Sequence, residues 1–272
     1  MSRISKVIQN RLESGGKVLI PYLVAGDPNL EQTLQLMHGL VTAGADIIEL
    51  GVPFSDPSSD GETIQRGAER AIAGGTSLRD VIDLVAEFRT GDDTTPVVLM
   101  GYLNPVEIMG NESFVAAASQ AGVDGVLLVD MPPTESANLK QLLTEADMDL
   151  IFLVAPTTSE KRARQIAGAC TGYLYYVSLK GVTGAAIKDT DAIASNVTLL
   201  RSFGELPVVI GFGIKDADSA ARMAALADGV VIGSALVERI AGLSAEQAPD
   251  ARRIKDAVSL IAAARQSLDH HD

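Results

Sequence analysis

A glutamate inside an apolar run is the residue of this sequence that is best placed for acid–base chemistry. Glu49 stands between Ile48 and Leu50, in a segment that reads as a strand. Successive side chains of a strand point to opposite faces, so Glu49 shares a face with Ile47 and not with its two neighbours. A carboxyl group in a protein interior costs several kcal/mol unless it is paired, hydrogen-bonded or protonated. We expect a functional carboxyl with a raised pKa, and a hydrogen-bonded structural glutamate is the alternative.

Three further acids lie close to the ends of expected strands. Asp60 is in the loop after the strand of Glu49, where it could face Glu49 across a substrate. Turn formation is an equal alternative, because Asp-Gly pairs commonly make turns. Asp56, in the same loop, is a rival for either role. Asp130 ends a later strand, and capping of the following turn or helix is the preferred interpretation of it.

Three groups of glycines in the last third of the chain predict a phosphate site. They are S-L-K-G-V-T-G-A (178–185), G-F-G-I (211–214) and G-S-A (233–235), each at the end of an expected strand. Glycines let backbone N–H groups approach an anion, and a helix N-terminus adds a favourable dipole. Glycines also end strands for ordinary reasons, which is the alternative. Lys180 could form a Schiff base, although a solvated lysine or one near phosphate suits this loop better.

The elements that must position these residues follow a regular alternation. Eight short apolar runs, most without in/out alternation, are typical of strands that are covered on both faces. They are residues 18–25, 45–52, 96–102, 125–130, 149–156, 173–179, 207–213 and 229–235. Helical spacing separates them at 30–43, 77–89, 112–121, 135–146, 159–169 and 216–226.

This alternation predicts an α/β fold, a single (β/α)8 TIM-barrel domain that spans residues 1–272. Apolar residues at helical spacing near the start, from Ile4 to Leu12, predict an extra N-terminal helix. The gap after the second strand begins with residues 51–61 and predicts an enlarged loop. A doubly wound open sheet is the competing architecture, but no G-x-G-x-x-G follows the first strand. In a barrel, the acids and glycines above would meet at the C-terminal ends of the strands.

Composition excludes several classes of function. The formal net charge of −13 and the aromatic content of 4% argue against a nucleic-acid binder. Cys170 is the only cysteine, so an internal disulfide or a multi-cysteine zinc site is excluded. His38 is the only histidine outside the C-terminal tail, which disfavours a catalytic triad or a histidine-rich metal site. Without a signal-peptide pattern or an apolar run of roughly 20 residues, we expect a cytoplasmic protein and no membrane span.

The chain resembles the tryptophan synthase alpha subunit family. The matching motifs are P-Y-L-V-A-G-D-P (21–28), E-L-G-V-P-F-S-D-P-x-x-D-G (49–61), L-M-x-Y-x-N-P (99–105), G-V-T-G (181–184), G-F-G-I (211–214) and G-S-A (233–235). They extend from the first expected strand to the eighth, so the resemblance covers nearly the whole chain. The second motif is the most specific, since it contains Glu49 and Asp60 at the separation found in the family.

The resemblance implies a lyase. Such an enzyme cleaves indole-3-glycerol phosphate to indole and glyceraldehyde 3-phosphate by a retro-aldol step, without a metal or organic cofactor. Glu49 would protonate C3 of the indole ring and take the proton of the side-chain hydroxyl. Asp60 would accept a hydrogen bond from the indole N–H and stabilise the positive charge that develops there. The implied partner is a beta subunit that holds pyridoxal phosphate in an alpha2-beta2 complex and receives indole through a tunnel for L-tryptophan synthesis.

The same matching assigns the substrate site. The residues of the indole pocket and its surroundings would be Tyr22, Ile64, Met100, Tyr102, Leu127, Tyr175, Thr183 and Phe212, with Tyr102 and Thr183 near the carboxylates. The phosphate would be bound by Gly184, Gly213, Gly233 and Ser234. The loops 53–60 and 179–190 would close over the substrate and face the beta subunit.

A few positions depart from the family pattern. Tyr22 stands where the family usually has phenylalanine, and its hydroxyl needs a partner at the pocket wall. Ser58 and Ser59 replace an apolar-alanine pair, and Glu62 replaces a common proline. These changes would alter loop closure or the contact with the beta subunit, and they leave Glu49 and Asp60 unchanged.

Other functions stay open at this point. One is an indole-glycerol-phosphate lyase that works without a beta partner. Another is a different phosphate-binding barrel, such as a Schiff-base aldolase that uses Lys180 or a sugar-phosphate isomerase. A third is a non-catalytic activator of a beta subunit, which would have no need for an interior carboxylate at position 49.

Overall fold

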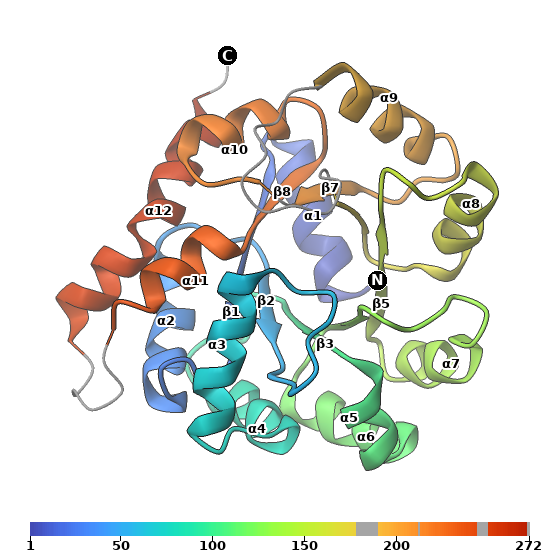
Figure 1. Cartoon of the computed structure of the whole chain (residues 1–272). Helices are drawn as coiled ribbons and strands as arrows, with labels where there is room; N and C mark the ends of the chain where they lie inside the picture. Colours follow the sequence, from blue (N-terminus) through green and yellow to red (C-terminus); the bar gives the residue numbers. More distant parts are fainter. Residues whose placement is uncertain (178–189, 212, 244–249, 271–272) are drawn as a thin grey trace.

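Eight parallel strands form a closed barrel in the computed structural model, which describes residues 1–177, 190–211, 213–243 and 250–270 (Figure 1). Each strand pairs with its neighbours in sequence, and β8 pairs with β1 to close the barrel. The strands are β1 (Val18–Val24), β2 (Ile48–Gly51), β3 (Val97–Gly101), β4 (Gly125–Leu128), β5 (Asp149–Val154), β6 (Leu174–Val177), β7 (Val208–Gly211) and β8 (Gly229–Ile232). All of them lie inside the predicted runs, so the (β/α)8 barrel is confirmed and the open sheet is excluded.

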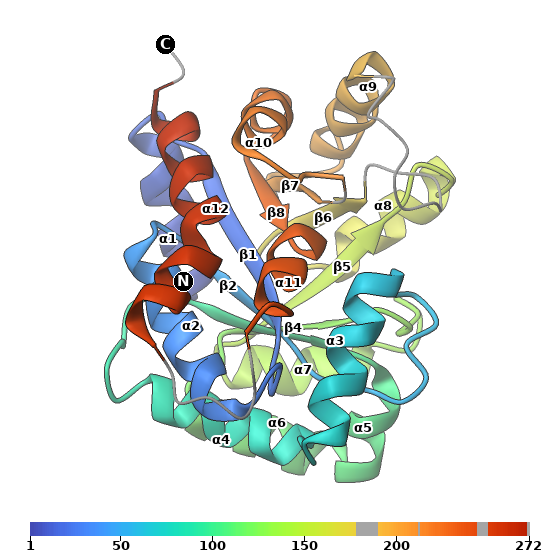
Figure 2. The ribbon, with the colours of Figure 1, turned by 60° about the vertical axis from the view of Figure 1, so that its left-hand side comes forward.

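Helices surround the barrel, and α12 packs against α2 and α10 on its outer side (Figure 2). Their bounds are α1 (Arg3–Glu13), α2 (Leu30–Thr42), α3 (Glu62–Ala73), α4 (Leu78–Phe88), α5 (Leu103–Met109), α6 (Asn111–Ala121), α7 (Ala137–Glu145), α8 (Glu160–Ala169), α9 (Thr190–Arg201), α10 (Ala217–Ala224), α11 (Ser234–Ile240) and α12 (Ala251–Asp269). In the described part of the chain, no helix combines the length and apolar character that crossing a membrane requires.

The long connection between β2 and β3 contains a helix that the apolar pattern did not reveal. Residues 52–61 form the loop, and α3 and α4 follow it in turn. The buried positions of α3 are Ile64, Gly67, Ala68 and Ala71, so three of its four buried residues are small. A face of small residues gives no pattern of large apolar residues at helical spacing.

The core has two layers, one on each face of the barrel wall. Ile48 and Leu50 belong to the outer layer, where the strands pack against the helices. Ile47 belongs to the inner layer, and Glu49 lies on the same face of β2. Helix α1 contributes Ile4 and Ile8 to the inner layer, and both are almost completely buried. The alternation along β2 therefore places the carboxyl of Glu49 inside the barrel, as the sequence predicted.

Aspartates fix the N-terminal ends of several strands. Each aspartate lies just before one strand, and its carboxylate accepts a hydrogen bond of 2.8 Å from a backbone N–H at the start of the preceding strand. The pairs are Asp46 with Leu19, Asp124 with Val97 and Asp228 with Val208. Arginines neutralise these carboxylates: Arg11 and Arg265 at Asp46, Arg3 and Arg89 at Asp124, and Arg201 at Asp228. This end of the barrel therefore holds paired charges with satisfied backbone groups, an arrangement that serves stability.

Removing one of these carboxylates should destabilise the fold strongly. Asp124→Ala leaves the N–H of Val97 without an acceptor and Arg89, whose side chain is only 12% exposed, without its carboxylate. We expect the free energy of unfolding to fall by about 3–5 kcal/mol, as for other broken buried ion pairs. Urea denaturation measures this change.

The matched control is Glu160→Ala, which breaks an exposed pair with Arg164 inside α8. That variant should lose less than about 1 kcal/mol. An equal loss of unfolding free energy in the two variants would contradict a stabilising role of the aspartates at the N-terminal ends of the strands.

Candidate active site

Glu49 is fully buried and only half satisfied. The hydroxyl of Tyr173, which directly precedes β6, donates a hydrogen bond of 2.6 Å to Oε1. The other oxygen, Oε2, has no hydrogen-bond partner among the residues that the structure describes. Burial raises the pKa of Glu49 to about 7, and the hydrogen bond from Tyr173 opposes this shift. The carboxyl can therefore both give and take a proton near neutral pH, with Oε2 free to do so.

Asp60 is held by a tyrosine from the next strand. The hydroxyl of Tyr102, just after β3, donates to Oδ2 of Asp60 at 3.0 Å and accepts from the N–H of Ser59 at the same distance. Burial raises the pKa of Asp60, and the hydrogen bond from Tyr102 lowers it. The backbone N–H of Asp60 also bonds to the carbonyl of Pro57. The backbone of Asp60 thus makes a turn while its carboxyl points to Tyr102. Turn formation and a catalytic role, the two alternatives for this residue, are therefore compatible.

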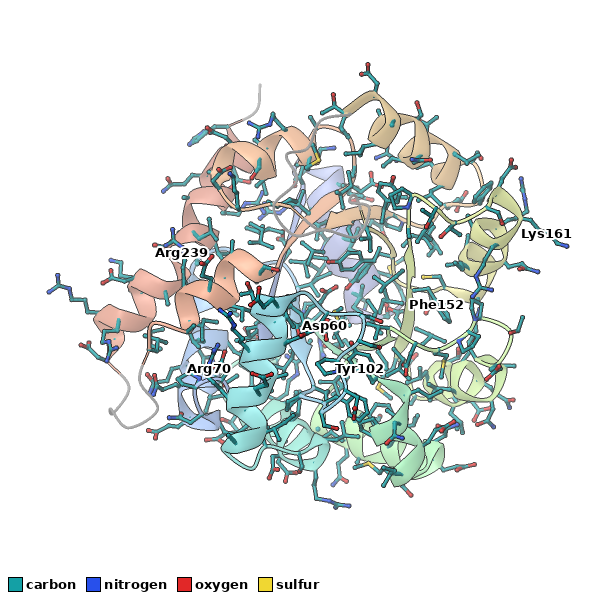
Figure 3. The ribbon with its side chains drawn as sticks, in the orientation of Figure 1. Asp60, Arg70, Tyr102, Phe152, Lys161 and Arg239 are labelled. Atoms are coloured by element: carbon teal, nitrogen blue, oxygen red, sulfur yellow. The ribbon has the colours of Figure 1, made fainter. Side chains whose placement is uncertain are left out.

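Both carboxyls and two tyrosines share one region of the barrel. Burial raises the pKa values of Tyr22 and Tyr175, and the charges of Asp60 and Glu49 raise them further. In the register of the sheet, Tyr22 lies directly beside Glu49. In the view of Figure 3, Asp60 lies near the centre of the molecule and Tyr102 lies just below it. The groups that the sequence analysis proposed for the reaction therefore lie close enough to influence one another.

Two glycines make room for the tyrosine hydroxyls, and sequence reasoning did not find their role. A Cβ atom at Gly51 would overlap the hydroxyl of Tyr22, and one at Gly211 would overlap the hydroxyl of Tyr175. Gly211 belongs to one of the glycine groups that predict a phosphate site. In the structure, the absence of a side chain at Gly211 leaves room for Tyr175. The only signal in the sequence is the position of each glycine at the end of its strand.

The remaining residues that the resemblance assigns to the indole pocket gather in the inner layer of the core. Tyr22, Ile64, Leu127 and Tyr175 are buried there, and Met100 packs against them. They come from β1, α3, β4, β6 and β3, and together they provide an apolar wall beside the carboxyls. Thr183 and Phe212, which were assigned to the same pocket, lie outside the described residues.

Of the residues that are predicted to bind phosphate, those that the structure describes lie just after β7 and β8. Gly213 has a φ of 76°, which favours glycine. Gly233 precedes α11 and Ser234 begins it. A Cβ atom at Gly233 would lie 3.6 Å from the ring of Tyr22, so the start of α11 is next to the predicted indole pocket. Gly184 and Lys180 lie outside the described residues.

The other two acids do not join Glu49 and Asp60. Asp56 is exposed and accepts a hydrogen bond of 2.6 Å from Ser55. Asp130 is exposed and accepts from the N–H of Leu103 at 2.8 Å, so it caps the start of α5. Capping was the preferred interpretation of Asp130, but the helix that it caps belongs to the preceding connection rather than to the following one.

Comparison with known proteins agrees with the motifs. Residues 8–266 match the family model described as tryptophan synthase alpha chain. The tryptophan synthase alpha chain of Thioalkalivibrio sulfidiphilus is 55% identical over 269 residues, which cover 99% of this chain and 100% of the relative. That of Alkalilimnicola ehrlichii is 56% identical over 244 residues, which cover 90% and 89%. The crystal structure of tryptophan synthase subunit alpha from Legionella pneumophila superposes with a TM-score of 0.89 at 39% identity and covers both chains completely.

Neutralising Glu49 should stabilise the fold in a pH-dependent way. The pKa of about 7 in the fold exceeds the usual value of 4.5, so the contribution of this carboxyl to stability is present below pH 4.5 and lost as the pH rises through 7. Glutamine is neutral at every pH. We expect Glu49→Gln to match the parent at about pH 4 and to exceed its free energy of unfolding by about 3 kcal/mol at about pH 8.

Urea denaturation at these two pH values measures the effect. The control is Asp93→Asn, because Asp93 is exposed to solvent. It should change the free energy of unfolding equally at both pH values. A Glu49→Gln variant with the same pH dependence as the parent would contradict the assigned burial effect.

Proposed function

Because the chain belongs to the tryptophan synthase alpha chain family, a family of lyases that cleave indole-3-glycerol phosphate, we propose that Glu49 and Asp60 are the catalytic residues of this cleavage. The observation that carries the proposal is the buried Oε2 of Glu49, which has no partner among the described residues, on a carboxyl with a pKa of about 7. A purely structural glutamate would have both oxygens satisfied.

Glu49 is suited to both proton transfers of the reaction. The retro-aldol step breaks the bond between C3 of the indole ring and the hydroxyl-bearing carbon of the glycerol phosphate chain. Protonation at C3 creates a positively charged ring nitrogen. Removal of the hydroxyl proton then forms the aldehyde, and the electrons of the broken bond return to the ring to give neutral indole. One carboxyl can give the first proton and take the second, so it ends the cycle as it began, and a pKa near neutrality serves both steps.

Asp60 is suited to the charge on the ring nitrogen. Its carboxyl is half-buried, so its interaction with a developing positive charge is stronger than it would be in water. The hydrogen bond from Tyr102 favours the ionised form and fixes the direction of the carboxylate. Two carboxyls in different environments, one deeply buried and one at the edge, can thus divide the acid–base and electrostatic roles.

The substrate-binding residues belong to the same proposal. The inner-layer wall of Tyr22, Ile64, Met100, Leu127 and Tyr175 supplies the apolar surface that an indole ring needs. Gly213, Gly233 and Ser234 would present backbone N–H groups to the phosphate. Thr183, Phe212 and Gly184 are assigned from the family resemblance alone.

A beta-subunit partner is implied by the family. The alpha2-beta2 stoichiometry, the transfer of indole through a tunnel and closure of the loops 53–60 and 179–190 toward that partner are parts of our proposal. Alpha chains of the family carry no pyridoxal phosphate themselves, and we propose none for this chain. A cytoplasmic location and the assignment of residues 1–272 to a single domain stay predictions.

Glu49→Gln should abolish release of indole from indole-3-glycerol phosphate. The amide has nearly the shape of the carboxyl but can neither give nor take the proton. Indole formation by the purified variant measures the loss, while thermal melting and binding of a beta subunit report on the fold. Near-normal turnover by a correctly folded variant would contradict the proposal.

Asp60→Asn should lower kcat strongly and change affinity for the phosphate end only slightly. The amide loses the negative charge that stabilises the ring nitrogen, whereas Gly213, Gly233 and Ser234, which are proposed to bind the phosphate, follow β7 and β8. Steady-state kinetics gives kcat, and binding of glycerol 3-phosphate reports on the phosphate site. Asp93→Asn, which is exposed and lies outside the loop 53–60, is the control and should retain kcat. Loss of binding with an unchanged kcat would refute the role of Asp60.

The central experiment is an indole-release assay on the chain alone and then with a beta subunit added. Cleavage by the chain alone with no response to any beta subunit would favour the stand-alone lyase. Stimulation by the beta subunit would support the complex, and absence of cleavage in both conditions would contradict the proposed chemistry.

A further inference from the structure

A second buried carboxylate lies at the catalytic end of the barrel, outside the pair of Glu49 and Asp60. Asp27, just beyond β1, is fully buried. Arg70 of α3 donates to both of its oxygens, from Nε to Oδ1 at 2.8 Å and from Nη2 to Oδ2 at 2.7 Å. A two-point contact between a guanidinium and a carboxylate fixes orientation as well as distance. The pair therefore sets the position of α3 against the loop that follows β1.

The backbone around Asp27 is held in place by hydrogen bonds and close packing. Gly26 has a φ of 85°, and its N–H donates to the hydroxyl of Thr33 at 3.1 Å. A Cβ atom at Gly26 would overlap the side chain of Thr76, between α3 and α4. The N–H of Asp27 also bonds to the carbonyl of Val24 at the end of β1. The turn before the carboxylate thus has little freedom to move.

Helix α3 approaches this point closely. A Cβ atom at Gly67, one turn before Arg70, would lie 3.0 Å from Oδ2 of Asp27 and 3.2 Å from the side chain of Val24. The helix also packs against α11, whose first residue is the proposed phosphate ligand Ser234 (Figure 2). Any shift or rotation of α3 would therefore disturb the contact of Arg70 with Asp27.

The same helix holds the loop that carries Asp60. Nε2 of Gln65, in the first turn of α3, donates to the carbonyl of Asp60 at 2.8 Å and to that of Pro57 at 3.3 Å. Asp60 itself lies only two residues before the helix. Figure 3 shows Arg70 at α3 and Asp60 nearer the centre of the barrel mouth. The backbone of the catalytic loop is therefore tied to α3 by hydrogen bonds, and α3 is tied to β1 by the ion pair.

We infer that Asp27 and Arg70 are positioning residues for the cleavage reaction, which act through α3 and Gln65 on the carboxylate of Asp60. The inference rests on the proposed role of Asp60. Neither residue touches the reacting atoms in this scheme. Their function is to hold the geometry in which the carboxylate meets the indole nitrogen, and small displacements of such a group lower the rate.

Arg70→Met tests the inference, with Arg66→Met as the matched control. Both arginines belong to α3, but Arg66 pairs with the exposed Glu62. We expect kcat for indole release to fall about tenfold in Arg70→Met and to stay within about twofold of the parent in Arg66→Met. Arg70→Lys, which keeps the charge but cannot make the two-point contact, should fall between them. Thermal melting confirms that each variant is folded at the assay temperature.

The double variant Asp27→Asn/Arg70→Met separates positioning from stability. Removing Arg70 alone leaves a buried charge, whereas removing both charges should restore much of the melting temperature. A positioning role predicts that kcat stays low while the melting temperature recovers. Recovery of both, or a kcat within twofold of the parent in Arg70→Met and Arg70→Lys, would overturn the inference.

Gln65→Leu tests the route to Asp60. Arg70 and Gln65 act on the same loop. The double variant Gln65→Leu/Arg70→Met should therefore lower kcat by less than the product of the fold-changes in the two single variants. Effects that multiply would overturn the proposed route. If Asp60→Asn lowers kcat while the Arg70 variants do not, this inference alone fails, whereas an unchanged kcat in Asp60→Asn would refute the proposed function itself.

Discussion

Burial of the Glu49 carboxyl inside a closed barrel is the constraint on which the catalytic end of the molecule depends. A charged carboxylate in this place would be costly, and a fully hydrogen-bonded one would be inert. One hydrogen bond from Tyr173 leaves the group between these limits, so that its pKa lies near neutrality. The strand that carries it has to alternate strictly, because a shift by one residue would turn the carboxyl into the helix layer.

The carboxylates at the two ends of the barrel differ in how completely they are paired. At the N-terminal end, Asp46 and Asp124 each bind a backbone N–H and two arginines, so their oxygens are satisfied. At the C-terminal end, Glu49 and Asp60 each receive one hydrogen bond, from a tyrosine, among the described side chains. Complete pairing gives stability, and incomplete pairing leaves oxygens for a substrate. Asp27 is the exception at the catalytic end, since Arg70 pairs it fully.

The sequence predicted what depends on local pattern and missed what depends on distant contacts. The eight strands and the inward face of Glu49 follow from apolar runs and a period of two. Tyr173 is 124 positions away from Glu49 and Arg70 is 43 away from Asp27, and only the closed barrel brings such residues together. Helix α3 escaped notice because its buried face consists mainly of glycine and alanine. The family motifs predicted which residues form the indole pocket, but they did not explain why position 51 is glycine.

The fit of the Tyr22 hydroxyl over Gly51, and of the Tyr175 hydroxyl over Gly211, restricts the order in which this site can evolve. Loss of a hydroxyl, by exchange of tyrosine for phenylalanine, needs no prior change at the glycine. A side chain at position 51 or 211 can be accepted only after the facing aromatic ring has been lost, because an added Cβ atom would also lie 2.7 Å from a ring carbon of Tyr22 or 2.4 Å from one of Tyr175. Each pair is thus epistatic in one direction, and exchange of Tyr22 for phenylalanine alone would still leave position 51 restricted to glycine.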